Sequence, residues 1–117
     1  MNVRLERFVD CTFVIPEGRI DFTSAPAFQA QLEQAISQQR APAAVIVDCG
    51  ALEYVSSAGL RAFLIAARAA QKAAIGFALC ALQPAVREVF ELSGFNRIMQ
   101  IHADRETARA LAQVPRA

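Results

Sequence analysis

Two adjacent hydroxyl residues, Ser56 and Ser57, lie where an apolar run gives way to a segment of helical composition. Residues 44–47 are apolar and rich in β-branched side chains, which predicts a strand covered on both faces. Residues 60–71 contain neither glycine nor proline and are rich in alanine, leucine and arginine, which predicts a helix. We therefore expect Ser57 at or next to the N-cap of that helix, where a hydroxyl or an attached phosphate meets free N–H groups.

This placement favours phosphorylation of Ser57 as the chemistry of the site. A negative charge at a helix N-terminus gains about 0.3–2 kcal/mol, whereas a thousandfold change in the binding of a partner requires about 4 kcal/mol. The larger contribution must come from the partner, because burying nearly two new negative charges in a dry interface costs several kcal/mol. We therefore expect phosphorylation to leave the domain folded while it expels a bound protein.

Four segments together carry a resemblance to a known family. Residues 54–60 read Tyr-Val-Ser-Ser-Ala-Gly-Leu, residues 18–21 read Gly-Arg-Ile-Asp, residues 45–48 end an apolar strand with Asp, and residues 82–95 contain a Pro-capped helix followed by Ser-Gly. In order and spacing they resemble the STAS domains, and among these the free-standing anti-sigma-factor antagonists. The resemblance implies a single domain spanning residues 1–117, with a core at roughly 4–113.

The resemblance places the phosphoacceptor of the family on Ser57. The family usually has Asp before this serine and Ser or Thr after it, where this chain has Ser56 and Ala58. We expect Ser56 to hydrogen-bond locally as a turn residue. Partner contacts are expected around the start of the helix and at the preceding turn, from Asp21, Ser56, Ser57, Ala58, Gly59, Arg61 and Ala62.

An antagonist of this kind is implied to bind a GHKL-type serine kinase that doubles as an anti-sigma factor, and to release it once phosphorylated. A phosphatase is a further expected partner. The loss of the Asp before Ser57 keeps a second hypothesis open, in which the chain is a constitutive STAS subunit of a lipid ABC transporter or of a larger signalling assembly. A third is binding of a small molecule or nucleotide at the carboxyl end of the sheet.

The composition argues against several other classes of function. The net charge is +1, with lysine and arginine scattered, so direct nucleic-acid binding is not expected. No window approaches the roughly 20 apolar residues of a membrane span, so membrane insertion is not expected either. Three cysteines without CxxC spacing are typical of reduced core residues in a cytoplasmic protein: Cys11, Cys49 and Cys80.

Catalysis and metal binding have little support in the sequence. His102 is the only histidine, it belongs to no Cys/His cluster, and no motif joins it to Ser57. The glycines near the helix do not have the spacing of a phosphate-binding loop. We therefore predict a protein that is acted upon by an enzyme, with no catalytic residues, no metal and no cofactor.

The periodicity of the remaining segments predicts the elements that position the site. Strands are expected at 3–9, 12–16, 44–48, 75–80 and 98–101. Helices are expected after Thr23 or Ser24, at 57–71, between Pro84 and Gly94, and after Asp104. This alternation predicts an α/β fold with a mixed, mostly parallel sheet of four to five strands and about four packed helices. The predicted core face of the helix at 57–71 consists of Leu60, Phe63, Leu64 and Ala67.

Overall fold

The computed structural model describes residues 1–112 and confirms the predicted α/β class. In these residues six strands form the sheet: β1 (Asn2–Arg7), β2 (Cys11–Ile20), β3 (Ala44–Asp48), β4 (Leu52–Val55), β5 (Gly76–Cys80) and β6 (Gln100–His102). The helices are α1 (Ala25–Ser37), α2 (Ser57–Ala73), α3 (Pro84–Leu92) and α4 (Arg105–Leu111), with a short 3-10 turn η1 (Phe95–Arg97). Residue 113, the end of the predicted core, lies outside the described residues.

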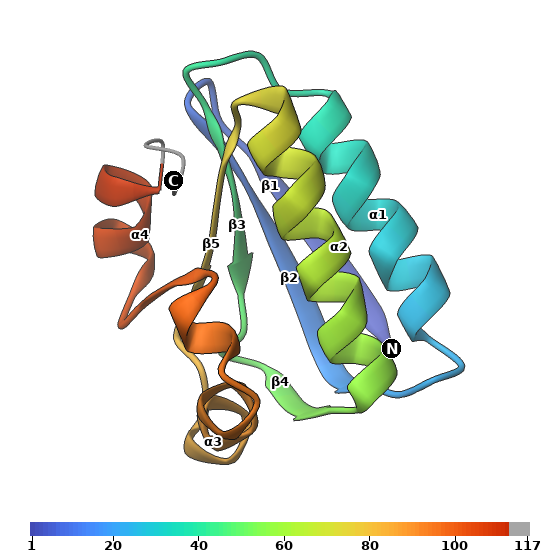
Figure 1. Ribbon diagram of the computed structural model, residues 1–117. Coiled ribbons are helices and arrows are strands. Elements are labelled where there is room, and N and C mark those ends of the chain that lie inside the picture. Colours follow the sequence, from blue (N-terminus) through green and yellow to red (C-terminus); the bar gives the residue numbers. More distant parts are fainter. Residues whose placement is uncertain (113–117) are drawn as a thin grey trace.

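The sheet has the strand order β1-β2-β3-β5-β6, and β4 pairs with β2 off this path. The β1–β2 pair is antiparallel and every other pair is parallel, which confirms a mixed, mostly parallel sheet. Helices α1 and α2 lie side by side on one face, α4 lies on the other, and α3 lies at the end of the sheet near β4 (Figure 1). This layering brings the loops before α1 and α2 to the same end of the molecule.

Strand β2 continues through Pro16, beyond the predicted end at residue 16. Pro16 faces Val3 in the β1–β2 register. The Phe8 N–H donates to the Cys11 carbonyl at 2.8 Å, and hydrogen-bonded and non-bonded pairs alternate along an antiparallel ladder. The pairing of Val3 with Pro16 therefore falls at a non-bonded pair, where the missing N–H of proline costs nothing.

Gly18 lets strand β2 pair with two different strands. Its φ of +90° is strained for any residue with a side chain, and the register shifts between Gly18 and Arg19. Before this point β2 pairs with β3, and after it β2 pairs with β4. Strand β4 was not predicted, and it raises the sheet above the expected four to five strands.

The larger core fills the space between the sheet and helices α1 and α2. Phe28, Phe63 and Phe90 are fully buried there and pack edge to face in a row, with ring centroids 5.2 and 5.3 Å apart. A smaller core beneath α4 contains Cys11 and Cys80, and all three cysteines are buried free thiols, as predicted. Burial raises the pKa of the Cys80 thiol to about 12.

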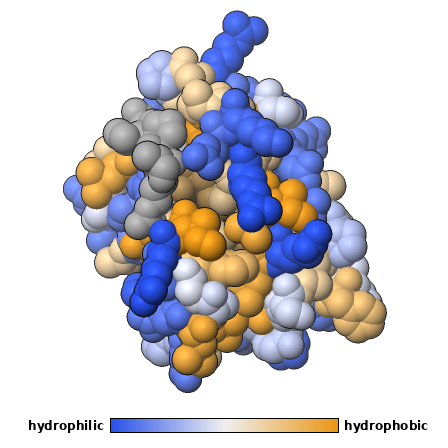
Figure 2. Space-filling model, in the orientation of Figure 1, coloured by the Kyte–Doolittle hydropathy of each residue, from blue (hydrophilic) through white to orange (hydrophobic). Residues whose placement is uncertain are grey.

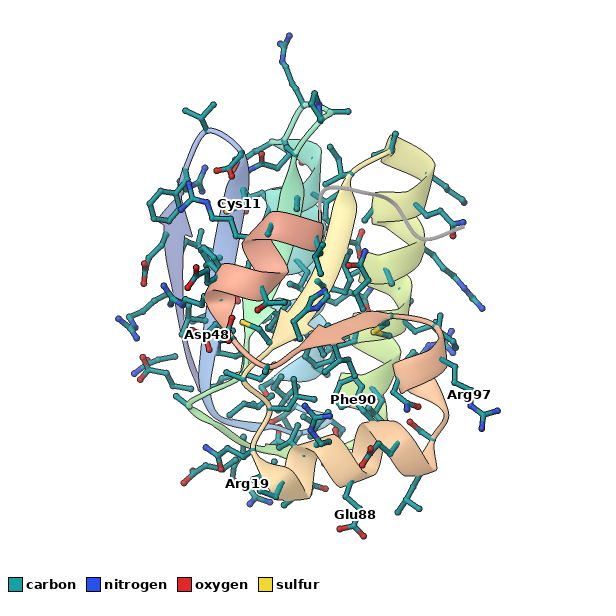
Figure 3. All side chains as sticks on the ribbon, turned by 90° about the vertical axis from the view of Figure 1, so that its left-hand side faces the viewer. Cys11, Arg19, Asp48, Glu88, Phe90 and Arg97 are labelled. Atoms are coloured by element: carbon teal, nitrogen blue, oxygen red, sulfur yellow. The ribbon has the colours of Figure 1, made fainter. Side chains whose placement is uncertain are left out.

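Helix α4 is fastened to the sheet by Arg105. Its guanidinium donates to Asp48 at 2.6 Å and to Glu6 at 3.0 Å, and it lies 4.6 Å from the centre of the Phe13 ring. These bonds connect α4 to β1 and to the carboxyl end of β3, where Asp48 is labelled in Figure 3. Asp104 caps α4 as predicted, and Leu111 at the end of this helix is 53% exposed.

Truncation of Phe63 tests the central role of the aromatic row. Phe63→Ala is expected to lower the free energy of unfolding by about 3–5 kcal/mol, because it leaves a cavity between two buried rings. The matched control is Phe22→Ala at a side chain that is 76% exposed, which should change stability by no more than about 0.5 kcal/mol. Denaturant unfolding of both variants provides the measurement, and equal losses would contradict this description of the core.

Candidate functional site

The start of α2 is tied to the sheet through Ser56. Ser56 is the N-cap of α2, and its hydroxyl accepts from the Gly59 N–H at 3.1 Å. Its own N–H donates to the Ile20 carbonyl at 2.8 Å, at the end of β2. The local hydrogen bond expected of Ser56 is therefore confirmed, and it fixes the first turn of α2 relative to β2 and β4.

Ser57 is the first residue of α2, next to the N-cap, and its side chain is exposed. Among residues 1–112 no hydrogen-bond partner occupies its hydroxyl. The N–H groups of Ser57 and Ala58 precede the point where bonding within the helix begins, and the first turn contains no acidic residue. A phosphate on this oxygen would thus meet unpaired donors and the positive end of the helix dipole.

Gly59 is a packing residue. A Cβ at this position would lie 2.9 Å from both Ile20 Cγ2 and Val55 Cγ1, which is closer than non-bonded carbon atoms approach each other. Ala62, predicted to contact a partner, is also in the core, with 1% of its surface exposed. Gly59 and Ala62 thus belong to the packed interior, and the partner contacts expected of them stay a prediction.

The core face of α2 is rotated from the one predicted. Phe63 is buried as expected, but Leu60, Leu64 and Ala67 are only partly buried at the border of the core. The other buried residues of α2 are small, which lets neighbouring elements approach the helix axis closely. They are Gly59, Ala62, Ala66 and Ala70.

Asp21 organises the turn before α1. One carboxylate oxygen accepts from the Thr23 hydroxyl at 2.7 Å and from the N–H groups of Thr23 and Ser24 at 3.0 Å each. These bonds, that of the Thr23 hydroxyl first among them, lower the pKa of Asp21 to about 2. Asp21 borders a hollow together with Arg19 and Glu53, separate from the groove next to Ser57.

A groove beside Ser57 contains a residue that the sequence analysis missed. Phe22 is 76% exposed, although phenylalanine usually lies inside proteins. Figure 2 shows apolar surface at the lower right, over the β2–α1 loop. The one sequence signal was that Phe22 directly follows the turn aspartate and lies out of phase with the buried stripe of α1. The groove is lined by Phe22, Ala25, Pro26, Gln29, Ala58 and Arg61.

The structure does not assemble the one conceivable serine–histidine pair. His102 lies on β6 and contacts the Gln100 side chain at 3.0 Å, and β5 and β3 separate β6 from the β2–β4 pair next to Ser57. Within residues 1–112 no three His, Cys, Asp or Glu side chains are grouped to hold a metal ion. No helix in this described part of the chain has the length and apolarity needed to cross a membrane.

The order of elements and the hydroxyl-bearing loop match one family over almost the whole chain. The family model described as the STAS domain matches residues 2–108. The chain belongs to the STAS domain family. This confirms the resemblance inferred from the four sequence segments, and with it the fold.

Named relatives of this STAS domain are anti-sigma factor antagonists. BtrV of Bordetella bronchiseptica, named as an anti-sigma factor antagonist, is 42% identical over 87 residues, which cover 74% of this chain and 75% of BtrV. The anti-sigma factor antagonist SpoIIAA, solved in its unphosphorylated form, is 25% identical with a TM-score of 0.76, over 92% of both chains. The phosphorylated form of the Bacillus cell fate determinant SpoIIAA matches with a TM-score of 0.68 and 24% identity, over 92% of this chain and 96% of that one.

Gly59→Ala tests the close approach of α2. The added methyl should lower the free energy of unfolding by about 1–3 kcal/mol, because it overlaps Ile20 and Val55. In a Val55→Ala background one of the two overlaps is gone, so the same change should cost less. Thermal or urea unfolding of the four proteins in this cycle gives the coupling, and strict additivity would contradict the packing described for Gly59.

The pKa of Asp21 supplies a second test. The pKa of Asp21 in the folded protein, about 2, lies below the ordinary 3.8. The charged carboxylate therefore stabilises the fold at pH values above 3.8, and this stabilisation is lost as the pH falls through about 2. Thr23→Val removes the strongest donor and should raise the pKa toward the ordinary value. NMR titration of the carboxyl carbon measures it.

Thr107→Val is the matched control for that titration, since the Thr107 side chain helps to lower the pKa of Asp104 at the other helix start. It should raise the pKa of Asp104 and leave the pKa of Asp21 unchanged. An Asp21 that titrates at its ordinary pKa in the parent protein would contradict the hydrogen-bonded turn.

Proposed function

We propose that this STAS domain is an anti-sigma-factor antagonist that works by partner switching. Unphosphorylated, it binds a GHKL-type serine kinase that acts as an anti-sigma factor, and phosphorylation of Ser57 ends the complex. The observation that carries the proposal is the exposed, unpaired Ser57 hydroxyl at the first residue of α2, beside the groove that contains Phe22. The names of BtrV and SpoIIAA, and the existence of a phosphorylated SpoIIAA, support it.

The fold can accept a phosphate at Ser57 without rearrangement. The side chain already points to solvent, so no buried group has to move. Arg61 lies one helical turn further along, is exposed, and belongs to the same side of α2 as Ser57. Its guanidinium and the first-turn N–H groups offset part of the added charge, so the modified domain stays folded.

A bound partner cannot accept the same phosphate as easily. The groove next to Ser57 places Phe22 and Ala58 against the partner, and a contact of this kind excludes water. Nearly two negative charges at its border would lose their hydration without finding new donors, at a cost of several kcal/mol. Aromatic side chains often dominate interface energies, which gives Phe22 the role of an anchor.

Ser56 and Asp21 act as positioning residues in this scheme. Ser56 caps α2 with a neutral hydroxyl, so a phosphate on Ser57 meets no carboxylate at the preceding position. Asp21 holds the turn that presents Phe22. A phosphatase would restore the binding form, and the kinase and sigma factor place the whole cycle in the cytoplasm.

The phosphorylation step can be tested with the cognate kinase and ATP. Intact mass should rise by one phosphate, and fragmentation should locate it on Ser57. Ser57→Ala should gain none, while Ser56→Ala, which keeps the acceptor, should still be modified. Phosphate elsewhere, or none in the parent protein, would contradict the assignment.

The release step is tested by binding. Ser57→Asp should weaken the complex with the kinase at least about a hundredfold, or roughly 2.7 kcal/mol. Gln34→Asp adds the same charge at an exposed position of α1 away from the groove and should leave binding unchanged. Equal affinities of the parent and Ser57→Asp would rule out switching, and recovery of a transporter ATPase from lysate in place of a kinase would favour a constitutive subunit.

A further inference from the structure

Strand β1 forms one edge of the sheet, and its outer side is open. The strand order places it beyond β2 with no further neighbour among residues 1–112. Figure 3 shows it at the left border of the sheet, with side chains but no ribbon beyond it. An open edge strand presents backbone N–H and C=O groups that can pair with another chain.

Alternate residues of β1 direct their backbone groups to this open side. The Phe8–Cys11 bond sets the phase of the β1–β2 ladder, so Arg4 and Glu6 face β2 with their hydrogen-bonding groups. The N–H and C=O groups of Val3, Leu5 and Arg7 therefore point outward. Two copies of β1 can form an antiparallel ladder only if these odd-numbered residues meet one another.

The charges of β1 select one register among those that remain. With Leu5 opposite Leu5 of a second copy, Arg4 faces Glu6 and Glu6 faces Arg4, at non-bonded positions where side chains lie closest. A shift by two residues in either direction brings Arg4 against Arg4 or Glu6 against Glu6. The charge pattern is thus self-complementary about Leu5 and repulsive in the neighbouring registers.

We propose that two copies of this domain associate through β1, antiparallel and centred on Leu5, to form one continuous sheet. Leu5 is 41% exposed and would cover its counterpart. The Arg4 side chain is 63% exposed and gives only Nε to Glu17, so its terminal nitrogens remain for Glu6 of the second copy. Glu6, though bonded to Arg105, keeps 39% of its side chain exposed.

The association is independent of the partner switch. Ser57 and its groove belong to α1, α2 and the loop between β2 and α1, and no residue of β1 lines that groove. A single pair of six-residue strands buries less than a standard interface, so the dimer is expected to exchange with monomer in the micromolar to millimolar range. If Ser57 were not phosphorylated, the proposed dimer would be unaffected. If the protein did not dimerise, the proposed partner switch would be unaffected.

Sedimentation equilibrium over this concentration range tests the proposal. The parent protein should approach twice the monomer mass of 12.7 kDa as concentration rises. Leu5→Lys should remain monomeric, because two ammonium groups meet on the dyad. The matched control is Leu92→Lys, at a leucine that is 80% exposed on α3, and it should dimerise like the parent. Circular dichroism shows that each variant is folded.

A charge reversal tests whether the proposed pairing register, and not only the exposure of Leu5, determines dimerisation. Arg4→Glu combined with Glu17→Arg keeps an ion pair within the chain but sets carboxylates against each other across the dyad, so dimerisation should weaken at least tenfold. A parent protein that stays monomeric throughout, or a Leu5→Lys variant that dimerises as the parent does, would overturn the proposal.

Discussion

The close seating of the first turn of α2 on the β2–β4 pair is the constraint on which the site depends. It requires the absence of a side chain at Gly59, where a methyl would overlap Ile20 and Val55. It also requires a short capping group, because the Ser56 hydroxyl reaches back to Gly59 while its N–H is held by the Ile20 carbonyl at 2.8 Å. With residues 56 and 59 fixed in this way, Ser57 is left on the outer side of the turn.

The same close approach decides which part of α2 can meet another protein. Its small residues are packed in the interior, where Ala62 and Ala70 each keep 1% of their surface exposed. Alanine enrichment along this helix is thus a packing feature. At the start of α2 the outward surface includes Ser57, Ala58 and Arg61, and Phe22 extends it from the neighbouring loop.

Local sequence signals allowed most helices and strands to be predicted. Features that depend on pairing between distant segments could not be predicted. Ser56 and Asp104 were read as a turn former and a helix cap because each bonds its own chain three residues later. Strand β4 was missed because it has four residues, two of them exposed, and exists through its pairing with the end of β2. The buried side of α2 was predicted wrongly because its leucines were assigned to the core, whereas its alanines lie there in the structure. Phe22 was missed because only its place after Asp21 and its phase relative to α1 set it apart from a core residue.

The ion pairs of the molecule explain why a charge added at Ser57 would act on binding more than on folding. Arg105 links α4 to Glu6 and Asp48, and Arg109 binds Asp10 at 2.8 Å, so these carboxylates stabilise the α4 side of the sheet. The first turn of α2, on the opposite face, contains no acidic residue. A phosphate there meets the helix dipole and Arg61 without competing for cations that hold the fold together. The proposed site of added charge at Ser57 and the ion pairs that hold α4 therefore lie on different faces of the sheet.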